Sequence, residues 1–289
     1  MAEYPAVRRI AVFTGSRAEY GLLRHLIAAI DADPALAVQL IVSGSHLSER
    51  HGSTVDEIHA DGLHPAALVP LSLEAPTPPS MAALSAEALA GVSEALEHLQ
   101  PQLLILLGDR YEAFAAAAAA HLLGIPIAHL HGGESTGGAV DDRLRHAITQ
   151  LSTWHFTAAE PYRQRVIAMG HPPERVWNVG PMVLDGLLAA PPASRSNFER
   201  ATGFSFGHRN MLITYHPETL LPDRGVEGFE ALLAALMDRL ANDTARALGH
   251  LPTTESGDLR ANVRLIIDFG FELLHSRDGL YLELARHWH

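Results

Sequence analysis

Short apolar runs alternate with longer segments of helical pattern along this chain. Runs of about five residues that are bounded by turn signals are typical of buried strands. Such runs occupy residues 9–14, 39–43, 103–107, 126–130 and 210–214. Helices are predicted at residues 18–32, 113–123 and 228–240, whereas residues 263–269 fit either a strand or part of a helix. This alternation predicts an α/β fold with parallel sheets that helices cover on both faces.

Two proline-rich stretches interrupt the alternation. Residues 75–79 (APTPP) predict a loop, and residues 190–196 (APPASRS) separate the first group of strands from a new one. A chain of 289 residues also exceeds the usual size of a single hydrophobic core. We therefore predict two Rossmann-like domains, residues 1–188 and residues 189–289.

The composition excludes several classes of chemistry. Hydrophobic residues make up 47% of the chain and charged residues 19%, which is typical of a globular protein. There is no cysteine, which excludes disulfides, thiolate metal sites and cysteine nucleophiles. All 21 basic residues are arginine, so a lysine Schiff base and a Walker-type phosphate-binding lysine are excluded as well.

The overall charge and the apolar segments narrow the range of partners. A formal net charge of −12 argues against a nucleic-acid partner, although local arginines still suit a small anionic ligand. Charges or prolines interrupt every apolar stretch well short of a membrane span, and no signal peptide is recognisable. We therefore expect a cytoplasmic protein that does not act at a membrane.

The first polar cluster follows the first predicted strand and contains Gly15, Ser16, Arg17, Glu19 and Tyr20. Glycine lets the turn pass close to a ligand, and backbone N–H groups at a helix start favour an anion. The Arg17 guanidinium could bind a diphosphate or a uracil carbonyl with two hydrogen bonds. The alternative is an ordinary strand-to-helix loop in which Ser16 caps the helix.

A second cluster follows the very apolar run at residues 103–107. Asp109 and Arg110 come directly after that run, which places them at the edge of the sheet and not in the core. Asp109 is a candidate acid or base and Arg110 a candidate anion clamp. The alternative is an aspartate that caps the next helix, which is common at this position.

A third cluster follows the predicted strand at residues 126–130. Paired glycines with imidazole and carboxyl groups nearby suit proton transfer on a sugar. Metal binding is the competing interpretation, but no compact HxxEH-type pattern is present, so we expect no metal. The candidate residues of this cluster are His131, Glu134, Asp141, Asp142, Arg145 and His146.

A fourth cluster, residues 214–219 (TYHPET), follows the first strand of the second domain. His216 is expected to face the first domain across a cleft. Its alternative role is helix capping around Pro217.

Taken in order, five segments resemble the hydrolysing UDP-N-acetylglucosamine 2-epimerases, whose relatives act on UDP-diacetylbacillosamine in legionaminic acid pathways. The segments are TGSRAEYGLL, GDRYE, HLHGGE, DDRLRHAITQLS and TYHPET, and the likeness runs over roughly residues 9–220. Each motif alone is weak, whereas the ordered set is specific. The resemblance implies a glycosyltransferase-B-like fold that holds UDP between two domains, with the sugar in the cleft and no cofactor. It also implies a homodimer, because family members are often dimers.

The resemblance also implies a reaction of elimination followed by hydration, in the synthesis of sialic-type or legionaminic-type acids. A base removes the proton on C2 while UDP leaves C1, and water then adds to the glycal from the other face, which yields the manno sugar. By resemblance, Asp109, Asp141 and one residue of HGGE transfer protons, and His216 supports the leaving group or acts as an acid. Several family members carry glutamate at the position of His131, so Glu134 is a second candidate for that role. The substrate contacts expected from these clusters are Gly15, Ser16, Arg17, Glu19, Tyr20, Arg110, Asp142, Arg145 and His146.

The resemblance weakens after Thr219. The family next carries a Gly-Asn-Ser-Ser-Ser-Gly loop that binds the diphosphate and then an Arg-Gln-x-Gly-Arg segment, and neither occurs in this sequence. An incomplete second domain is therefore expected. The alternatives to an active epimerase are an inactive or fragmentary paralogue and a glycosyltransferase of the same fold.

Overall fold

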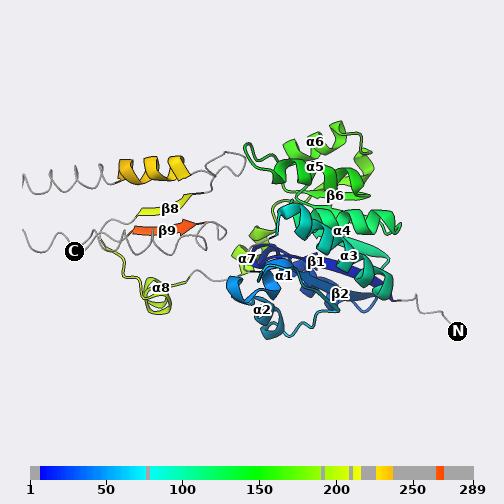
Figure 1. Cartoon of the computed structure of the whole chain (residues 1–289), viewed down its shortest axis with the longest axis horizontal. Helices are drawn as coiled ribbons and strands as arrows, with labels where there is room; N and C mark the ends of the chain where they lie inside the picture. The colour runs from blue at the N-terminus through cyan, green and yellow to red at the C-terminus, as the bar shows by residue number, and fades with distance from the viewer. Residues whose placement is uncertain are drawn as a thin grey trace, which may run out of the picture. The chain divides into compact units, whose positions relative to one another are not determined.

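The computed structural model describes residues 7–75, 79–189, 193–207, 211–215, 226–236 and 265–269. The chain forms two compact units, one that ends at Pro191 and one that begins at Pro192 (Figure 1). None of the helices within the described ranges is both long enough and apolar enough to cross a membrane.

The first unit is built on a seven-stranded parallel sheet with the order β3-β2-β1-β4-β5-β6-β7. Its strands are β1 Arg8–Thr14, β2 Leu36–Ser43, β3 Ala67–Val69, β4 Leu103–Leu107, β5 Ile127–Leu130, β6 Trp154–Thr157 and β7 Val176–Asn178. Its helices are α1 Arg17–Asp31, α2 Val55–Ala60, α3 Met81–Leu99, α4 Tyr111–Leu122, α5 Asp141–Leu151, α6 Glu160–Ala168 and α7 Val183–Ala189. Short 3-10 turns lie at η1 Gly44–Leu47, η2 Glu49–His51 and η3 Pro173–Arg175. The predicted parallel α/β sheet is confirmed.

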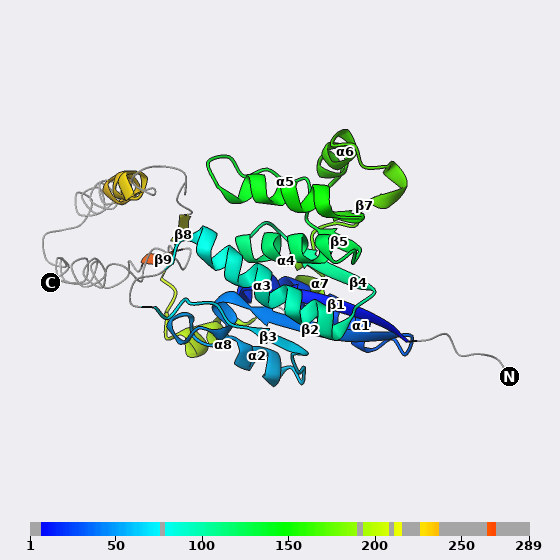
Figure 2. The same cartoon turned by 45° about the vertical axis from the view of Figure 1, so that its right-hand side comes forward.

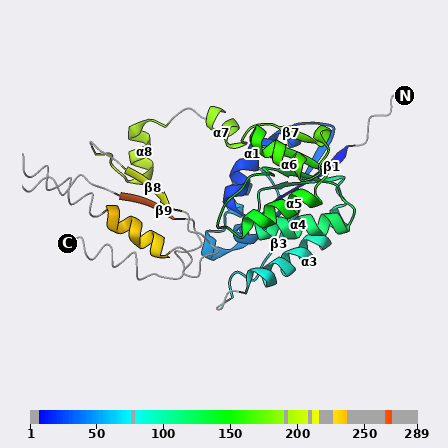
Figure 3. The same cartoon turned by 90° about the horizontal axis from the view of Figure 1, so that it is seen from above.

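Helices cover both faces of this sheet. Figure 3 places α3, α4 and α5 on one side of the strands and α1 and α7 on the other. Figure 2 shows α3, α4 and α5 side by side along their face. The short strands are apolar on both faces because each face is buried under helices.

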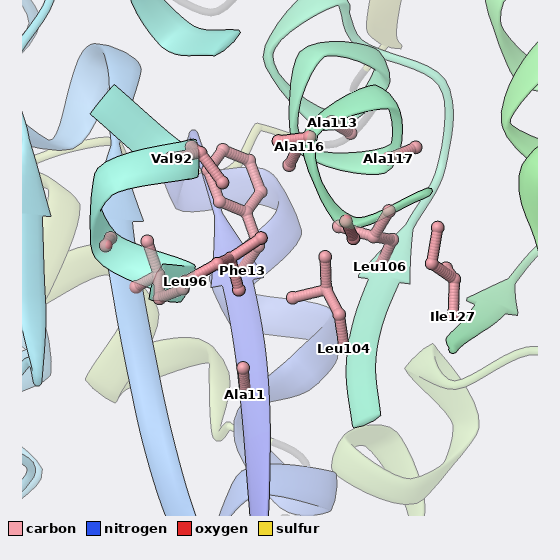
Figure 4. Packing of buried hydrophobic residues seen from close by; sticks show 14 of the residues in the cluster. Ala11, Phe13, Val92, Leu96, Leu104, Leu106, Ala113, Ala116, Ala117 and Ile127 are labelled. Atoms are coloured by element: carbon pink, nitrogen blue, oxygen red, sulfur yellow. The ribbon is translucent and has the colours of Figure 1, made fainter. Parts of the chain in front are cut away.

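The core beneath α3 and α4 depends on small side chains. Helix α4 reads YEAFAAAAAAHL, and Ala113, Ala116 and Ala117 are at most 1% exposed. These alanines face Leu104 and Leu106 of β4 in Figure 4. An alanine surface allows a helix to approach a sheet closely, since no long side chain separates the two backbones. Helix α4 is therefore held close over β4.

The other face is covered by an amphipathic helix. Tyr20, Leu23, Ile27 and Ile30 of α1 recur every three or four residues and are all buried. They pack with Val12 and its neighbours in β1 and with residues of β2 and β4. The spacing of these apolar side chains fixes which side of α1 faces the sheet, and it brings the first turn of α1 to the carboxyl end of β1.

The second unit also contains parallel strands in its described residues. Strand β8 Met211–Tyr215 pairs in parallel with β9 Leu265–Phe269, and residues 226–236 are helical. Helix α8 Arg195–Thr202 is capped by Ser194, whose hydroxyl accepts a hydrogen bond from the Asn197 N–H at 3.2 Å. The segment that fitted either a strand or a helix is thus a strand from Leu265 onward.

Candidate active site

The strand order reverses at one point of the sheet of the first unit. From β1 the chain proceeds to β2 and β3 on one side, and from β4 to β7 on the other. The loops after β1 and β4 therefore leave the sheet in opposite directions. In open parallel sheets a ligand binds outside the carboxyl ends of the strands at such a switch point. The first two polar clusters of the sequence lie there, and the third follows β5, the next strand.

In the loop between β1 and α1, polar groups hold the start of the helix. The Ser16 hydroxyl accepts a hydrogen bond from the Glu19 N–H at 3.4 Å, and Glu19 Oε2 accepts one from the Gly15 N–H at 2.7 Å. This is a variant of the capping box, with the glutamate reaching back one residue further than usual. Ser16 thus acts as the predicted helix cap, and Glu19 points inward at 6% exposure.

Arg17 and Tyr20 lie three residues apart on α1 and differ in exposure. The Arg17 side chain is 68% exposed and pairs with Glu57 at 2.8 Å, so its guanidinium can be reached from solvent. Tyr20 is buried, and its hydroxyl donates a hydrogen bond to Asp61 at 2.6 Å. Burial raises the pKa of Tyr20, and the Asp61 carboxylate raises it further. Arg17 is thus the accessible charge at the start of α1, whereas the Tyr20 hydroxyl is hydrogen-bonded to Asp61, the residue after α2.

The loop between β4 and α4 supplies a second guanidinium. Arg110 Nε and NH2 donate to the two carboxylate oxygens of Glu112 at 3.2 and 3.0 Å. Glu112 itself is 1% exposed and lies in the first turn of α4. Glu112 was not among the predicted site residues, because an acidic residue in a first helical turn is common and its burial depends on distant loops. This ion pair fixes the direction of Arg110.

Asp109 is held from the side of α5. Its carboxylate contacts the guanidinium of Arg145, a residue that is only 7% exposed. Arg145 NH1 also donates to the Thr136 hydroxyl at 3.3 Å, so the same side chain ties down the loop after β5. An arginine that is bound at several points fixes the position of its carboxylate partner. The structure therefore brings together two residues that the sequence placed in different clusters.

The loop after β5 contains a carboxylate–imidazole pair. His131 Nδ1 lies 3.0 Å from Glu134 Oε1, and the Met182 N–H donates to His131 Nε2 at 3.4 Å. Because Nε2 accepts, Nδ1 carries the proton and donates it to Glu134. This hydrogen bond lowers the pKa of Glu134, and the charge of Arg145 contributes to the shift. His131 and Glu134, the two candidates for the same proton-transfer role, are thus hydrogen-bonded to each other.

The backbone of this loop is tightly constrained. His131 has a φ of 62° and Gly133 a φ of 80°, both in the left-handed region. A Cβ on Gly133 would lie 2.5 Å from the Tyr162 carbonyl oxygen, so only glycine fits. The carbonyl of Gly133 accepts a hydrogen bond from Arg165. A non-glycine residue with positive φ at a candidate site, such as His131, indicates a conformation that the surrounding contacts impose.

The start of α5 carries the remaining acidic candidates. Asp141 and Asp142 are the first two residues of the helix. Asp142 Oδ1 accepts a hydrogen bond from the Thr136 N–H at 2.6 Å, which lowers the pKa of Asp142. His146 lies one turn further along, and among the described residues nothing is hydrogen-bonded to its buried Nδ1. Asp142 thus fixes the backbone of the loop at Thr136, and the Nδ1 atom of His146 has no hydrogen-bond partner among the described residues.

His129 of β5 connects the loop after β4 with helix α5, and it was not among the predicted site residues. It is fully buried, with Nε2 2.8 Å from the Gly108 carbonyl oxygen and Nδ1 3.1 Å from the Thr149 hydroxyl. A carbonyl oxygen only accepts, so Nε2 carries the proton. Burial lowers the pKa of His129 to about 4, so the ring is neutral at physiological pH. A histidine between apolar residues of a strand was the sequence signal for this role.

Two further expectations concern His216 and a metal ion. His216 lies outside the described residues, so its predicted role stays a prediction. Within the ranges that the structure describes, no group of three or more histidine, aspartate or glutamate side chains is arranged to hold a metal ion.

A parallel α/β sheet with carboxylate, imidazole and guanidinium groups at its switch point is an arrangement that suits an anionic ligand. A family model described as UDP-N-acetylglucosamine 2-epimerase matches residues 28–269, and the chain belongs to this family.

Two similar curated proteins carry more specific names. The chain is 37% identical over 231 residues to the UDP-N,N'-diacetylbacillosamine 2-epimerase (hydrolyzing) of Legionella pneumophila, which corresponds to 80% of this chain and 61% of that protein. It is 34% identical over 235 residues to the GDP/UDP-N,N'-diacetylbacillosamine 2-epimerase (hydrolyzing) of Campylobacter jejuni, with 81% and 61% covered. The matched part of the chain thus spans 61% of the length of each of these relatives.

Solved structures of 2-epimerases share the fold. The UDP-GlcNAc 2-epimerase of Methanocaldococcus jannaschii in complex with UDP-GlcNAc and UDP has a TM-score of 0.68 at 16% identity, with 91% of this chain and 74% of that chain covered. The UDP-N-acetylglucosamine 2-epimerase of Rickettsia bellii has a TM-score of 0.66 at 21% identity, with 92% and 70% covered. The predicted α/β, glycosyltransferase-B-like fold class is thereby confirmed.

Proposed function

We propose that this chain is a hydrolysing 2-epimerase of a UDP-linked N-acetyl sugar, either UDP-GlcNAc or a diacetylamino relative. It converts the sugar nucleotide to the free manno sugar and UDP, for nonulosonic acid synthesis. Family membership and the names of the relatives from Legionella and Campylobacter support this proposal. The observation that carries it is the contact of Asp109 with Arg145 in the loop beside the His131–Glu134 pair.

Proton removal from C2 requires a base whose position is fixed. Asp109 is held by Arg145, and a carboxylate in such a fixed position is suited to accept a proton from carbon. His131 is oriented by Glu134, and a carboxylate–imidazole pair can take up a proton and return it. We assign removal of the C2 proton and its later replacement to these groups together with Asp141. His216 is assigned to support of the leaving group.

Departure of UDP from C1 requires positive charge near the diphosphate. Arg17 is the first residue of α1 and Arg110 directly precedes α4, so the two arginines follow the two strands that flank the switch point. Guanidinium groups and a helix N-terminus both stabilise the charge that develops on a leaving phosphate. We assign these arginines to the diphosphate.

The test is turnover in heavy water. The purified chain is incubated with UDP-GlcNAc and, separately, with UDP-N,N'-diacetylbacillosamine, and the products are analysed for UDP, manno sugar and deuterium at C2. We expect all three with at least one substrate. Release of UDP without deuterium at C2 would contradict elimination, and stabilisation by UDP without turnover would favour an inactive paralogue.

Two variants separate the site from the fold. Asp109→Asn is expected to abolish turnover because the amide cannot accept the C2 proton. The matched control is Asp31→Asn, an exposed position in the last turn of α1, and it should keep wild-type turnover. Wild-type activity of Asp109→Asn would refute the assigned role.

A further inference from the structure

Two buried carboxyl groups lie together beneath the loops of the switch point. Glu19 on α1 is 6% exposed and Glu112 on α4 is 1% exposed. Both flank Gly15, since a Cβ at that residue would lie 3.4 Å from Glu19 Oε2 and 3.3 Å from Glu112 Cβ. A Cβ at Gly44 would lie 3.0 Å from Glu112 Oε1. Gly15 therefore lies against both acids, and Gly44 lies against Glu112.

The two carboxyl groups differ in the hydrogen bonds that they accept. Both oxygens of Glu112 accept from Arg110, at 3.0 and 3.2 Å. Glu19 Oε2 accepts from the Gly15 N–H, whereas Glu19 Oε1 is buried and receives no hydrogen bond from any residue that the structure describes. A buried charged oxygen without a donor is costly, so a proton belongs on Glu19 Oε1.

The charged groups that act on Glu19 come from the loop between β4 and α4 and from the first turn of α4. Burial raises the pKa of Glu19 to about 7, Arg110 lowers it, and Glu112 and Asp109 raise it. His46 in η1 packs against Tyr20 and is neutral near pH 7, because burial lowers its pKa to about 4. Arg110 is therefore the group whose positive charge most favours an ionised Glu19.

We propose that Glu19 is a positioning residue that couples anion binding to the uptake of one proton. This coupling rests on the proposed function, because the anion is the diphosphate assigned to Arg110. When a phosphate neutralises the Arg110 guanidinium, the charge that favours an ionised Glu19 is lost. Solvent then supplies a proton to Oε1, and Glu19 keeps Gly15 and the start of α1 in place as a neutral acid. Glu112 holds Arg110 in the required direction.

The coupling predicts the direction in which UDP affinity changes with pH. Above about pH 7 the unliganded protein loses the proton of Glu19. The liganded protein keeps it, so UDP affinity falls as the pH rises. For a single proton the affinity changes by at most about tenfold per pH unit.

The experiment is isothermal titration calorimetry of UDP into the whole chain at pH 7 to 8.5, in buffers of different ionisation enthalpy. The measured quantity is the number of protons taken up by wild type minus that for Glu19→Gln, because free UDP also titrates near neutral pH. We expect a positive difference of up to about one proton. We also expect a several-fold loss of wild-type affinity across this range relative to Glu19→Gln.

Further variants distinguish coupling from a purely structural role. Glu112→Gln should move the pH dependence to lower pH, because the Glu112 charge raises the pKa of Glu19. Glu97→Gln on α3 removes an equal charge from an exposed position and should behave as wild type. If Glu19→Gln does not fold, the shift in the pH dependence of UDP affinity in Glu112→Gln decides whether Glu19 couples proton uptake to binding.

The outcomes separate the two proposals. Equal proton uptake by wild type and Glu19→Gln, or an unmoved pH dependence in Glu112→Gln, would overturn the coupling and leave the epimerase proposal intact. Absence of UDP binding by the wild type would overturn the diphosphate assignment, and the coupling with it.

Discussion

His129 Nε2 donates a hydrogen bond to the carbonyl oxygen of Gly108 at 2.8 Å. The bond joins the end of β5 to the residue before Asp109. The position of the proposed base therefore depends on a neutral imidazole in the neighbouring strand, and it does not depend on its own loop alone.

We predict that His129→Ala destabilises the first unit by about 2–4 kcal/mol. The change leaves a cavity and removes hydrogen bonds to the Gly108 carbonyl and to Thr149 of α5 in a fully buried place. Urea unfolding measured by circular dichroism checks this, with His121→Ala as the control because His121 is exposed near the end of α4. Equal midpoints for the two variants would show that the His129 contacts contribute little.

The stability of the protein should fall as the pH decreases from 6.5 to about 4. Burial lowers the pKa of His46 and His129 to about 4 and that of His155 to about 3. The unfolded chain therefore binds protons in this window that the folded chain excludes, at about 1.4 kcal/mol per proton and pH unit. Glu19 acts in the opposite direction, because it is protonated in the folded chain and ionised in the unfolded one between pH 4.5 and about 7.

Thermal unfolding between pH 7.5 and 5 measures this slope. His155 lies 3.0 Å from His171 through ring nitrogens, and its Nδ1 is buried without a partner among the described residues. His155→Phe should therefore reduce the pH dependence by about one proton. An unchanged slope would show that His155 does not contribute.

Gly133→Ala should destabilise the protein by about 2 kcal/mol or more and lower turnover. The new methyl group would meet the Tyr162 carbonyl, and the residue has a positive φ that alanine disfavours. Gly137→Ala is the matched control, since a Cβ there meets nothing within 4 Å. Comparable melting temperatures for both variants would contradict the tight fit of the loop.

Arg17→Ala is expected to weaken UDP binding about tenfold or more while the stability changes by less than about 1 kcal/mol. The ion pair of Arg17 with Glu57 is exposed and contributes little to folding, whereas a bond to phosphate is charge-assisted. Calorimetric titration with UDP measures the effect. The control is Arg24→Ala. Arg24 lies further along α1 and pairs with Asp61, and its variant should bind UDP as the wild type does. An unchanged affinity of Arg17→Ala would exclude it from the site.

Sequence patterns located the strands that build the site. The apolar run at residues 103–107 is β4 Leu103–Leu107, and the run at residues 9–14 lies within β1 Arg8–Thr14. Polar clusters at strand ends could be located because an apolar run must stop where the chain leaves the sheet. Helix α3 Met81–Leu99 was not identified, although it is the longest helix among the described residues. Its apolar residues spread around much of its circumference and give a weak period.

The partners of the site residues could not be predicted in the same way. Arg145 meets Asp109 across 36 positions of the sequence, and His129 meets Gly108 across 21. Such contacts depend on how neighbouring strands align, which local patterns do not encode. The inward direction of Glu19 likewise follows from the Gly15 N–H and from the space beside Glu112.

The alanine face of α4 has a consequence for how this protein can evolve. Arg110 directly precedes that helix and Glu112 lies in its first turn, and the buried alanines that follow have no longer side chains that could change rotamer to absorb a change. Any enlargement of those alanines would move the helix as a rigid body and displace the guanidinium with it. Tolerance of substitutions at this edge of the sheet is therefore limited by core residues that lie outside the candidate site.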